Sequence, residues 1–288
     1  MTIEKEEVKN GSPLYVVGIG ASAGGLEAIE AFFEHMPQKT GLAFVVVQHL
    51  SPDHKSLMDE LLSRKTSIPV SIVKQDTKIT ANHIYLLPTN QEMIISNGHF
   101  FLSERDKSIG ISYPINTFFK SLASDFQHRS IGVVLSGSGA DGTKGIEAIH
   151  DAGGFSIAQE PDSCSFPDMP RSAISSRCID LILPPNRMAD SIIRYSQTTE
   201  RVSHHLQLGA PEVDEGRFGE VILLLRNRFD LDFSQYKPST ITRRLDRRLV
   251  AKKLESLQEY LNVLLTDEEE LQALYFDLLI GVTNFFRD

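Results

Sequence analysis

Residues 14–26, LYVVGIGASAGGL, join a short apolar run to a glycine-rich turn. An apolar run of this length, broken by glycines, is typical of a buried strand. Large apolar residues then recur at helical spacing, at Leu26, Ile29, Phe32, Phe33 and Met36. A buried strand followed by a tight turn and an amphipathic helix is the repeating unit of a parallel sheet.

The same alternation continues to about residue 195. Further strand candidates are residues 42–47, 69–73, 131–135, 155–158 and 179–183. Strands that are apolar throughout occur in parallel sheets covered on both faces. Between two other apolar segments, Asn97-Gly98 favours a two-residue hairpin turn. The sequence therefore predicts an α/β domain over residues 14–195, with a doubly wound, mainly parallel sheet and an antiparallel hairpin.

The pattern changes near residue 196. Residues 196–215 are polar and show neither period, which predicts a linker, and residues 1–13 are expected to be a tail. After the linker the strand pattern stops, and Phe218 to Phe229 has helical spacing. Ser256-Leu-Gln-Glu259 and Thr266-Asp-Glu-Glu269 both fit a capping box at the start of a helix. Residues 216–288 are therefore expected to form a small all-α domain.

The composition excludes several classes of function. A net charge of −9 over 288 residues argues against a general nucleic-acid binder, which carries a basic excess. No apolar run reaches the length needed to cross a bilayer, and the polar N-terminus does not fit a signal peptide. Cys164 and Cys178 form no metal-binding motif. These features predict a cytoplasmic protein without a metal site or a membrane-inserted segment.

The glycine-rich turn after the first strand admits three interpretations. Gly18-x-Gly20-x-x-Ala23 fits the fingerprint of a dinucleotide-binding site. Gly20-x-Ser22-x-Gly24 fits a nucleophile elbow, in which a sharp turn presents a serine at the end of a strand. The third interpretation is a tight turn whose glycines only permit close packing.

The residues at the ends of two other strands favour the interpretation of this turn as a nucleophile elbow. A dinucleotide site needs an acidic residue about 20 positions further on, but the second strand ends in Gln48-His49. A histidine is the general base that a nucleophilic serine needs. After the strand at 131–135 comes Asp141, which either caps the next helix or orients the histidine. Because active sites of such sheets gather at the carboxyl ends of the strands, we expect a triad of Ser22, His49 and Asp141.

Five segments resemble the catalytic domain of chemotaxis receptor methylesterases of the CheB type. Over residues 14–195 they are, in order, GIGASAGG, VVVQHL, LSGSGADGTKGI, AQEPDSCSFPDMPRSAI and IDLILPP. The resemblance implies hydrolysis of glutamate methyl esters on chemoreceptors, often with deamidation of glutamines, and no cofactor. It also implies that Ser22 attacks the ester, that His49 is the base and that Asp141 holds its tautomer. Backbone N–H groups around Ala23 and Ser138 are the expected oxyanion donors.

Some features depart from the pattern of that family. Ala23 stands where a threonine usually follows the nucleophile, and Ser138 stands where a methionine is usual. The usual member has a receiver domain in front, so we expect that phosphorylation of such a domain does not regulate this chain. These departures motivate an alternative, a catalytically weak or silent adaptor within a larger two-component signalling protein. A nucleotide-binding Rossmann protein is the third option.

The C-terminal part resembles the N-terminal domain of chemotaxis receptor methyltransferases of the CheR type. The resemblance covers residues 216–288 and rests on Tyr236-Lys237, on ITRRLDRRL at 241–249 and on VTNFFRD at 282–288. It implies a fusion of esterase and transferase that stops before the cofactor-binding domain. Thr283 and Arg287 match positions that contact S-adenosylmethionine, the cofactor of a full-length transferase only.

A basic stripe is predicted on one helix of this second domain. Its members are Arg243, Arg244, Arg247, Arg248, Lys252 and Lys253. One interpretation is a solvated face. The other is a surface that docks an acidic helix by electrostatic attraction, such as the methylation region of a receptor. The expected partner is a methylated receptor or a receptor-like helical protein.

Overall fold

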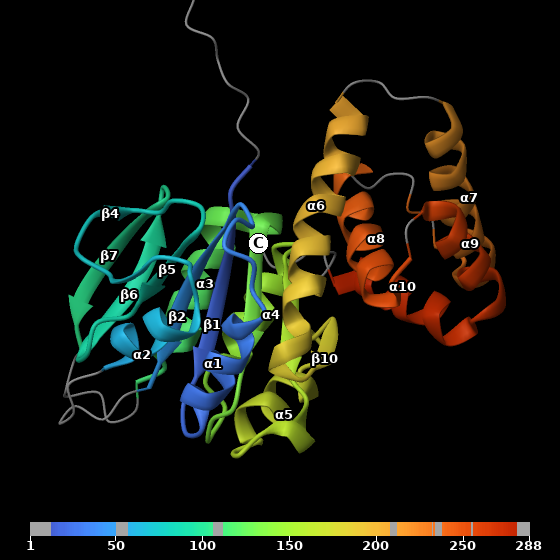
Figure 1. Ribbon diagram of the computed structural model, residues 1–288. Helices are drawn as coiled ribbons and strands as arrows, with labels where there is room; N and C mark the ends of the chain where they lie inside the picture. The colour runs from blue at the N-terminus through green and yellow to red at the C-terminus, as the bar shows by residue number, and fades with distance from the viewer. Residues whose placement is uncertain are drawn as a thin grey trace, which may run out of the picture.

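The computed structural model describes residues 13–49, 57–105, 112–207, 212–231, 233, 238–254 and 256–280 (Figure 1). The main sheet consists of β1 (Tyr15–Ala21), β2 (Leu42–Gln48), β3 (Val70–Ile72), β5 (His83–Leu86), β8 (Ser130–Val134), β9 (Phe155–Gln159) and β10 (Leu181–Leu183). Its strand order is β10-β9-β8-β1-β2-β5-β3, and all these neighbours pair in parallel. The predicted α/β class and parallel sheet are confirmed.

A topological switch point lies at the centre of this sheet. The chain leaves β1 through α1 (Gly25–Glu34) and returns in β2 on one side. It leaves β8 through α4 (Thr143–Asp151) and returns in β9 on the other side. Because these two connections diverge, the carboxyl ends of the adjacent strands β1 and β8 border the crevice where open α/β sheets bind ligands.

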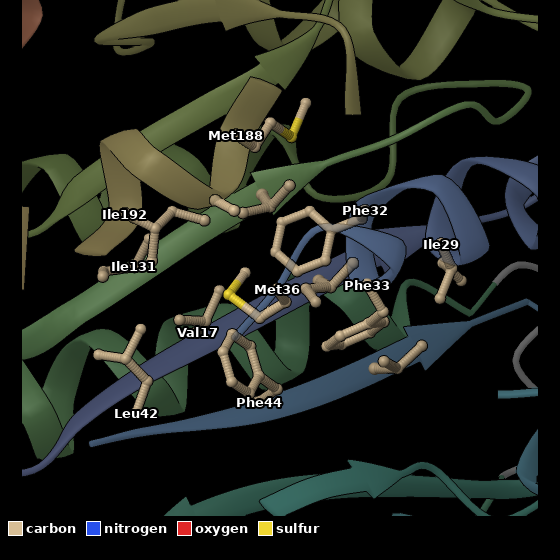
Figure 2. Close-up of a cluster of buried hydrophobic side chains, with 14 of the residues drawn as sticks. Val17, Ile29, Phe32, Phe33, Met36, Leu42, Phe44, Ile131, Met188 and Ile192 are labelled. Carbon is tan, nitrogen blue, oxygen red and sulfur yellow. The ribbon is translucent and has the colours of Figure 1, made fainter. Parts of the chain in front are cut away.

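Helices cover both faces of the sheet. One face carries α1, α2 (Met58–Lys65) and α6 (Met188–Gln207), and the other carries α3 (Pro114–Phe126), α4 and α5 (Asp168–Ser175). Figure 2 shows the core under α1, where Phe33 packs edge to face on both Phe32 and Phe44, with ring centroids 4.9 and 5.4 Å apart. Short 3₁₀ helices lie at Gln127–Arg129, Pro161–Ser163 and Pro185–Arg187. The two-sided cover explains why the strands are apolar throughout.

The predicted hairpin is confirmed and belongs to a separate antiparallel sheet of β4 (Thr77–Lys78), β7 (His99–Glu104) and β6 (Gln91–Ser96). Asn97 and Gly98 both have positive φ, 51° and 72°, as the two-residue turn requires. Asp125 of α3 accepts hydrogen bonds from both of their N–H groups, each 2.8 Å long. This clamp fixes the hairpin against α3.

The second domain is all-α, as predicted, with α7 (Glu212–Phe229), α8 (Pro238–Lys252), α9 (Leu257–Thr266) and α10 (Glu268–Ile280) around a core of its own. Ser256 caps α9 by accepting the N–H of Glu259. The second predicted capping box is wrong, because Thr266 ends α9 and Asp267 accepts the N–H of Glu270 at 3.0 Å. A carboxylate one position later takes over the capping role.

The predicted linker over residues 196–215 is wrong in most of its length. α6 continues to Gln207, and α7 already begins at Glu212. The first half of α6 is anchored in the core by Met188, Ile192 and Tyr195. Once a helix is nucleated, each further residue adds a hydrogen bond at little cost, so polar residues can extend it. No helix in the described ranges has the length and apolar character to cross a membrane.

Candidate functional site

Ser22 follows directly on β1, at the carboxyl edge of the sheet. Its backbone N–H donates to the carbonyl of Ser136 at 3.0 Å, and its carbonyl accepts the N–H of Gly25 at 2.9 Å. Gly24 has a φ of 65°, a left-handed conformation that turns the chain from the strand into α1. The half-buried Ser22 therefore lies at a sharp strand-to-helix turn, as in a nucleophile elbow.

Asp141 is buried after β8, and its carboxylate is held from several sides. Oδ2 accepts the N–H of Ile115 at 2.9 Å, and Oδ1 accepts the N–H groups of Asn116 and Gly142 at 2.9 and 2.8 Å. Nε2 of His49 lies 2.8 Å from Oδ2. Ile115 and Asn116 belong to the first turn of α3, whose positive end favours a carboxylate. Asp141 thus contacts the imidazole of His49 and also caps the amino end of α3.

His49 lies one residue beyond β2 and is tied to the strand that leads to Ser22. Its backbone N–H donates to the carbonyl of Ala21 at 3.1 Å. Because Nε2 faces Asp141, Nδ1 is the ring atom left for a hydroxyl group. Among the described residues, no hydrogen bond of 3.5 Å or less joins Ser22 to His49. Such contacts are often loose without substrate and tighten in the reacting complex.

The loop after β8 packs directly against the serine. A Cβ atom on Gly137 would lie 2.8 Å from Cβ of Ser22 and would overlap the sulfur of Met169. Met169 is buried, and its N–H donates to the carbonyl of Gly137 at 2.9 Å. Only glycine leaves the space that this contact requires.

Replacing Gly137 by alanine should therefore displace Ser22. We expect a loss of about 1–3 kcal/mol in the free energy of unfolding, typical of overpacking, and a marked fall in ester hydrolysis. Gly219→Ala is the matched control, because open space surrounds that glycine. Chemical denaturation and an ester turnover assay measure both effects, and a Gly137→Ala protein with unchanged values would contradict this packing.

The structure adds residues that the sequence reasoning missed. Oγ of Ser136 donates to the carbonyl of Ala23 at 2.9 Å and accepts the N–H of Phe166 at 3.0 Å. Gln159, buried at the end of β9, accepts the N–H of Ser136 at 2.9 Å. These bonds tie the serine turn to two neighbouring loops. The signal that could have found them is the one that indicated His49, a polar residue at the carboxyl end of an apolar strand.

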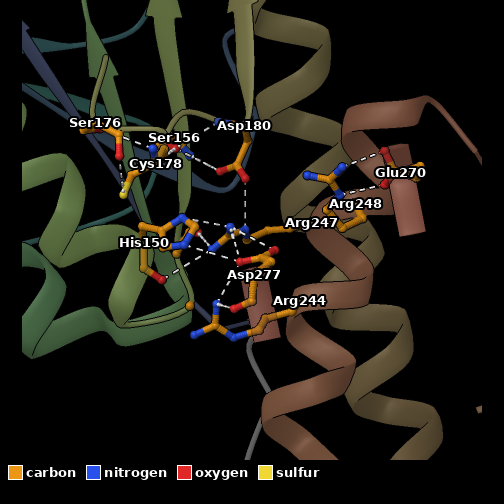
Figure 3. A network of polar contacts seen from close by, with 12 residues as sticks. His150, Ser156, Ser176, Cys178, Asp180, Arg244, Arg247, Arg248, Glu270 and Asp277 are labelled. Carbon is orange, nitrogen blue, oxygen red and sulfur yellow. Dashed lines mark hydrogen bonds and ion pairs between the residues drawn. The ribbon is translucent and has the colours of Figure 1, made fainter. Parts of the chain in front are cut away.

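The predicted docking stripe is wrong for the arginines whose side chains are described (Figure 3). Arg244 donates to Oδ1 of Asp277 at 2.8 Å, and Arg248 makes hydrogen bonds of 2.7 and 2.6 Å to Glu270. Arg247 is 2% exposed. Their carboxylate partners come from α10, so the spacing within one helix could not reveal them. The side chain of Arg243, and all of Thr283 and Arg287, lie outside the described residues.

A buried histidine beside these arginines predicts a pH effect on stability. Burial and then the charge of Arg247 lower the pKa of His150 to about 3, from a usual value near 6.5. Between these values the unfolded chain binds a proton that the folded chain does not, so stability falls as the pH drops. We expect the loss to approach about 1.4 kcal/mol per pH unit below pH 6.

The contribution of His150 is isolated by comparison with His150→Asn, whose amide oxygen can still accept from Arg247. Urea denaturation at pH 7 and pH 5 should show a shallower pH dependence for this variant. Equal slopes in the two proteins would show that His150 does not titrate as stated.

Comparison with protein families gives two matches. Residues 17–192 match the model described as CheB methylesterase, and residues 217–279 match the model described as CheR methyltransferase, all-alpha domain. The CheB methylesterase catalytic domain of Thermotoga maritima is similar in structure, with a TM-score of 0.58 at 27% identity. The likeness covers 63% of this chain and 98% of that domain. Both resemblances inferred from the sequence motifs are confirmed.

Curated relatives are similar over comparable ranges. A putative protein-glutamate methylesterase/protein-glutamine glutaminase of Leptospira interrogans is 28% identical over 62% of this chain and 93% of its own length. Protein-glutamate methylesterase/protein-glutamine glutaminase 2 of Methanosarcina acetivorans is 31% identical over 67% of this chain and 56% of its own. An uncharacterized 104.1 kDa protein of Rhodobacter capsulatus is 36% identical over 80% of this chain, which spans only 26% of that protein.

Proposed function

This chain belongs to the CheB methylesterase family, and from that premise we propose that it hydrolyses glutamate methyl esters on chemoreceptor-like signalling proteins. Deamidation of glutamine side chains at the same site is part of the proposal. The observation that supports it most is the 2.8 Å contact between His49 and the buried Asp141, beside the turn that carries Ser22. The contact lies at the switch point of the sheet, where the reacting groups of this fold class gather.

In the proposed mechanism, Oγ of Ser22 attacks the ester carbonyl while Nδ1 of His49 takes the hydroxyl proton. Asp141 accepts from Nε2–H, which fixes the tautomer and stabilises the imidazolium that forms. The imidazolium returns the proton to the leaving methoxide, so that methanol departs and an acyl-serine remains. His49 then takes a proton from a water molecule as that water attacks the acyl carbonyl, and the imidazolium returns the proton to Oγ of Ser22 as the bond to the serine breaks, which releases the glutamate.

The tetrahedral intermediates carry a negative charge on the former carbonyl oxygen. The N–H groups of Ala23 and Ser138 have no acceptor within the described part of the chain, which supports them as its donors. All groups in this scheme come from the chain itself, so no cofactor is proposed for the esterase step. The side chains of Ala23 and Ser138 do not enter the scheme, because the proposed donors are backbone groups.

A serine-directed fluorophosphonate tests this function on the whole chain. We expect one covalent adduct, mapped by mass spectrometry to the peptide that contains Ser22, and none in a Ser22→Ala protein. The reagent needs an activated serine, so buried or unactivated serines serve as internal controls. Labelling spread over several serines, or none in folded protein, would refute the proposed nucleophile.

A non-catalytic adaptor is the second candidate function. Within the described residues, the missing hydrogen bond between Ser22 and His49 favours it. An adaptor predicts that folded protein binds a methylated receptor peptide but reacts with neither the peptide nor the fluorophosphonate. Binding by calorimetry and methanol release, measured on the same preparation, separate the two functions.

The match of the second domain supports a larger proposal for the whole protein. We propose a cytoplasmic fusion in which a CheR-type transferase adds the groups that the esterase removes, on a common helical receptor. S-adenosylmethionine would serve only the complete transferase, with Thr283 and Arg287 among its contacts.

A further inference from the structure

We propose that one corner of the methylesterase domain is a specific docking site for the CheR-type helical domain, anchored by Arg247. Three residues that Arg247 contacts form this corner: His150 near the end of α4, Gly154 just before β9, whose carbonyl oxygen lies 3.5 Å from Nη1, and Asp180 just before β10. Docking there holds the two domains together independently of the chain between them and leaves the Ser22 edge open.

Arg247 reaches from α8 across the boundary between the domains (Figure 3). Its Nε lies 3.0 Å from Oδ1 of Asp180, and its Nη2 lies 2.9 Å from Nδ1 of His150. On the side of the helical domain, the same Nη2 lies 3.1 Å from Oδ1 of Asp277. The guanidinium group is thus placed between one carboxylate from each domain.

Each half of this interface is organised within its own domain. Asp180 accepts the N–H and the hydroxyl of Ser156 at 2.8 and 2.9 Å, so the methylesterase domain positions it without help. Asp277 is held by Arg244, which belongs to the same helical domain as Arg247. Two preformed surfaces with matching hydrogen-bond groups pay little ordering entropy when they meet, which favours a specific contact.

The charges of the two surfaces are complementary. The helical side carries two guanidinium groups and one carboxylate, and the corner carries the carboxylate of Asp180 and a neutral His150. A different docked arrangement that buried either Arg247 or Asp180 would leave that side chain without its charged partner. Removing one partner of a buried ion pair is strongly unfavourable, so this contact selects one arrangement over others.

Apolar packing accompanies the ionic contacts. Val250, one turn after Arg247 on α8, is buried in the core cluster of the methylesterase domain together with Ile192 and Tyr195 of α6. Residues three positions apart lie on one face of a helix, so a single face of α8 supplies both kinds of contact.

The docking corner lies at the opposite end of the strands from the candidate site. Gly154 and Asp180 precede β9 and β10 and therefore lie at the amino ends of parallel strands. Ser22 and His49 follow the carboxyl ends of β1 and β2. Figure 1 shows the helical domain beside α6, away from the turn between β1 and α1, to which Ser22 belongs.

Chain cleavage tests the docking on the complete protein. A protease site inserted between Gln207 and Glu212 is cut after folding, and the product is run on gel filtration. We expect the two fragments to elute together as a one-to-one complex at micromolar concentration. Arg247→Ala should weaken their association by about 100-fold or more. Separation of the wild-type fragments would overturn the proposal.

Two further variants keep the result interpretable. Arg228→Ala removes an ion pair with Glu268 inside the helical domain and should leave the association unchanged. Asp180→Asn changes the methylesterase side, and circular dichroism checks that each uncut variant is folded. If Arg228→Ala and Arg247→Ala weakened the association equally, the specific role of Arg247 would be wrong.

The open edge has a test that does not depend on esterase activity. In a Ser22→Cys protein, the rate at which a bulky maleimide reacts at residue 22, followed by mass spectrometry, reports access to the site. We expect equal rates in the docked protein and in the Arg247→Ala background. A rate at least tenfold higher after loss of docking would show that the helical domain shields Ser22.

Discussion

Replacing Ser22 by alanine abolishes methanol release from a methylated receptor peptide, with a fall in turnover on the order of 10⁶. In the proposed mechanism the hydroxyl oxygen of Ser22 forms the acyl intermediate, and the backbone around it offers no substitute. The side chain makes no hydrogen bond within the described structure, so its removal should leave the thermal unfolding temperature nearly unchanged. Loss of activity without loss of stability is therefore the expected signature.

The matched control is Ser124→Ala, on the exposed face of α3. That protein should retain its turnover, because the same atoms are removed away from the carboxyl edge. Methanol release and thermal unfolding are measured on all three proteins. Turnover by Ser22→Ala at the rate of the parent protein would exclude the serine mechanism.

Replacing Asp141 by asparagine should lower turnover by on the order of 10⁴, through the tautomer of His49. The carboxylate accepts from three backbone N–H groups as well as facing Nε2. An amide has one acceptor oxygen and one donor group, so its NH₂ must face at least one of these partners. If it faces Nε2, the proton of the imidazole moves to Nδ1, which can then no longer accept the proton of Ser22.

The same substitution should also cost about 1–3 kcal/mol of stability, because a buried N–H group of α3 loses its acceptor. Asp125→Asn is the matched control, since Asp125 likewise accepts two backbone N–H groups, but at the hairpin. It should lose stability and keep its turnover. Equal turnover losses in both variants would indicate that Asp141 only supports the fold.

The sheet, and the candidate site residues at the carboxyl ends of three of its strands, could be predicted from the sequence for a simple physical reason. Parallel strands point the same way, so residues that follow Ala21 and Gln48 must share one edge. The partners of Asp141 could not be predicted, because Ile115 and Asn116 lie 26 and 25 residues before it, in the first turn of α3. A local sequence pattern does not indicate a contact between residues so far apart in the chain.

The arginines of α8 also show that a local sequence pattern does not reveal long-range partners. Arg247 pairs with Asp180 and Asp277, 67 residues before it and 30 residues after it. Helical spacing correctly indicated that several basic side chains share a face. It did not indicate whether that face meets water, a separate partner or another domain of the chain, because this depends on long-range packing.

The position of the docking corner bears on how such a protein could diversify. Exchange or loss of the C-terminal module alters contacts near Gly154 and Asp180, at the opposite end of the strands from the candidate catalytic residues. Gene rearrangements at this boundary would therefore leave the approach of substrate to the serine unchanged. A different module could then be recruited at this corner without a change in the selection acting on the candidate catalytic residues.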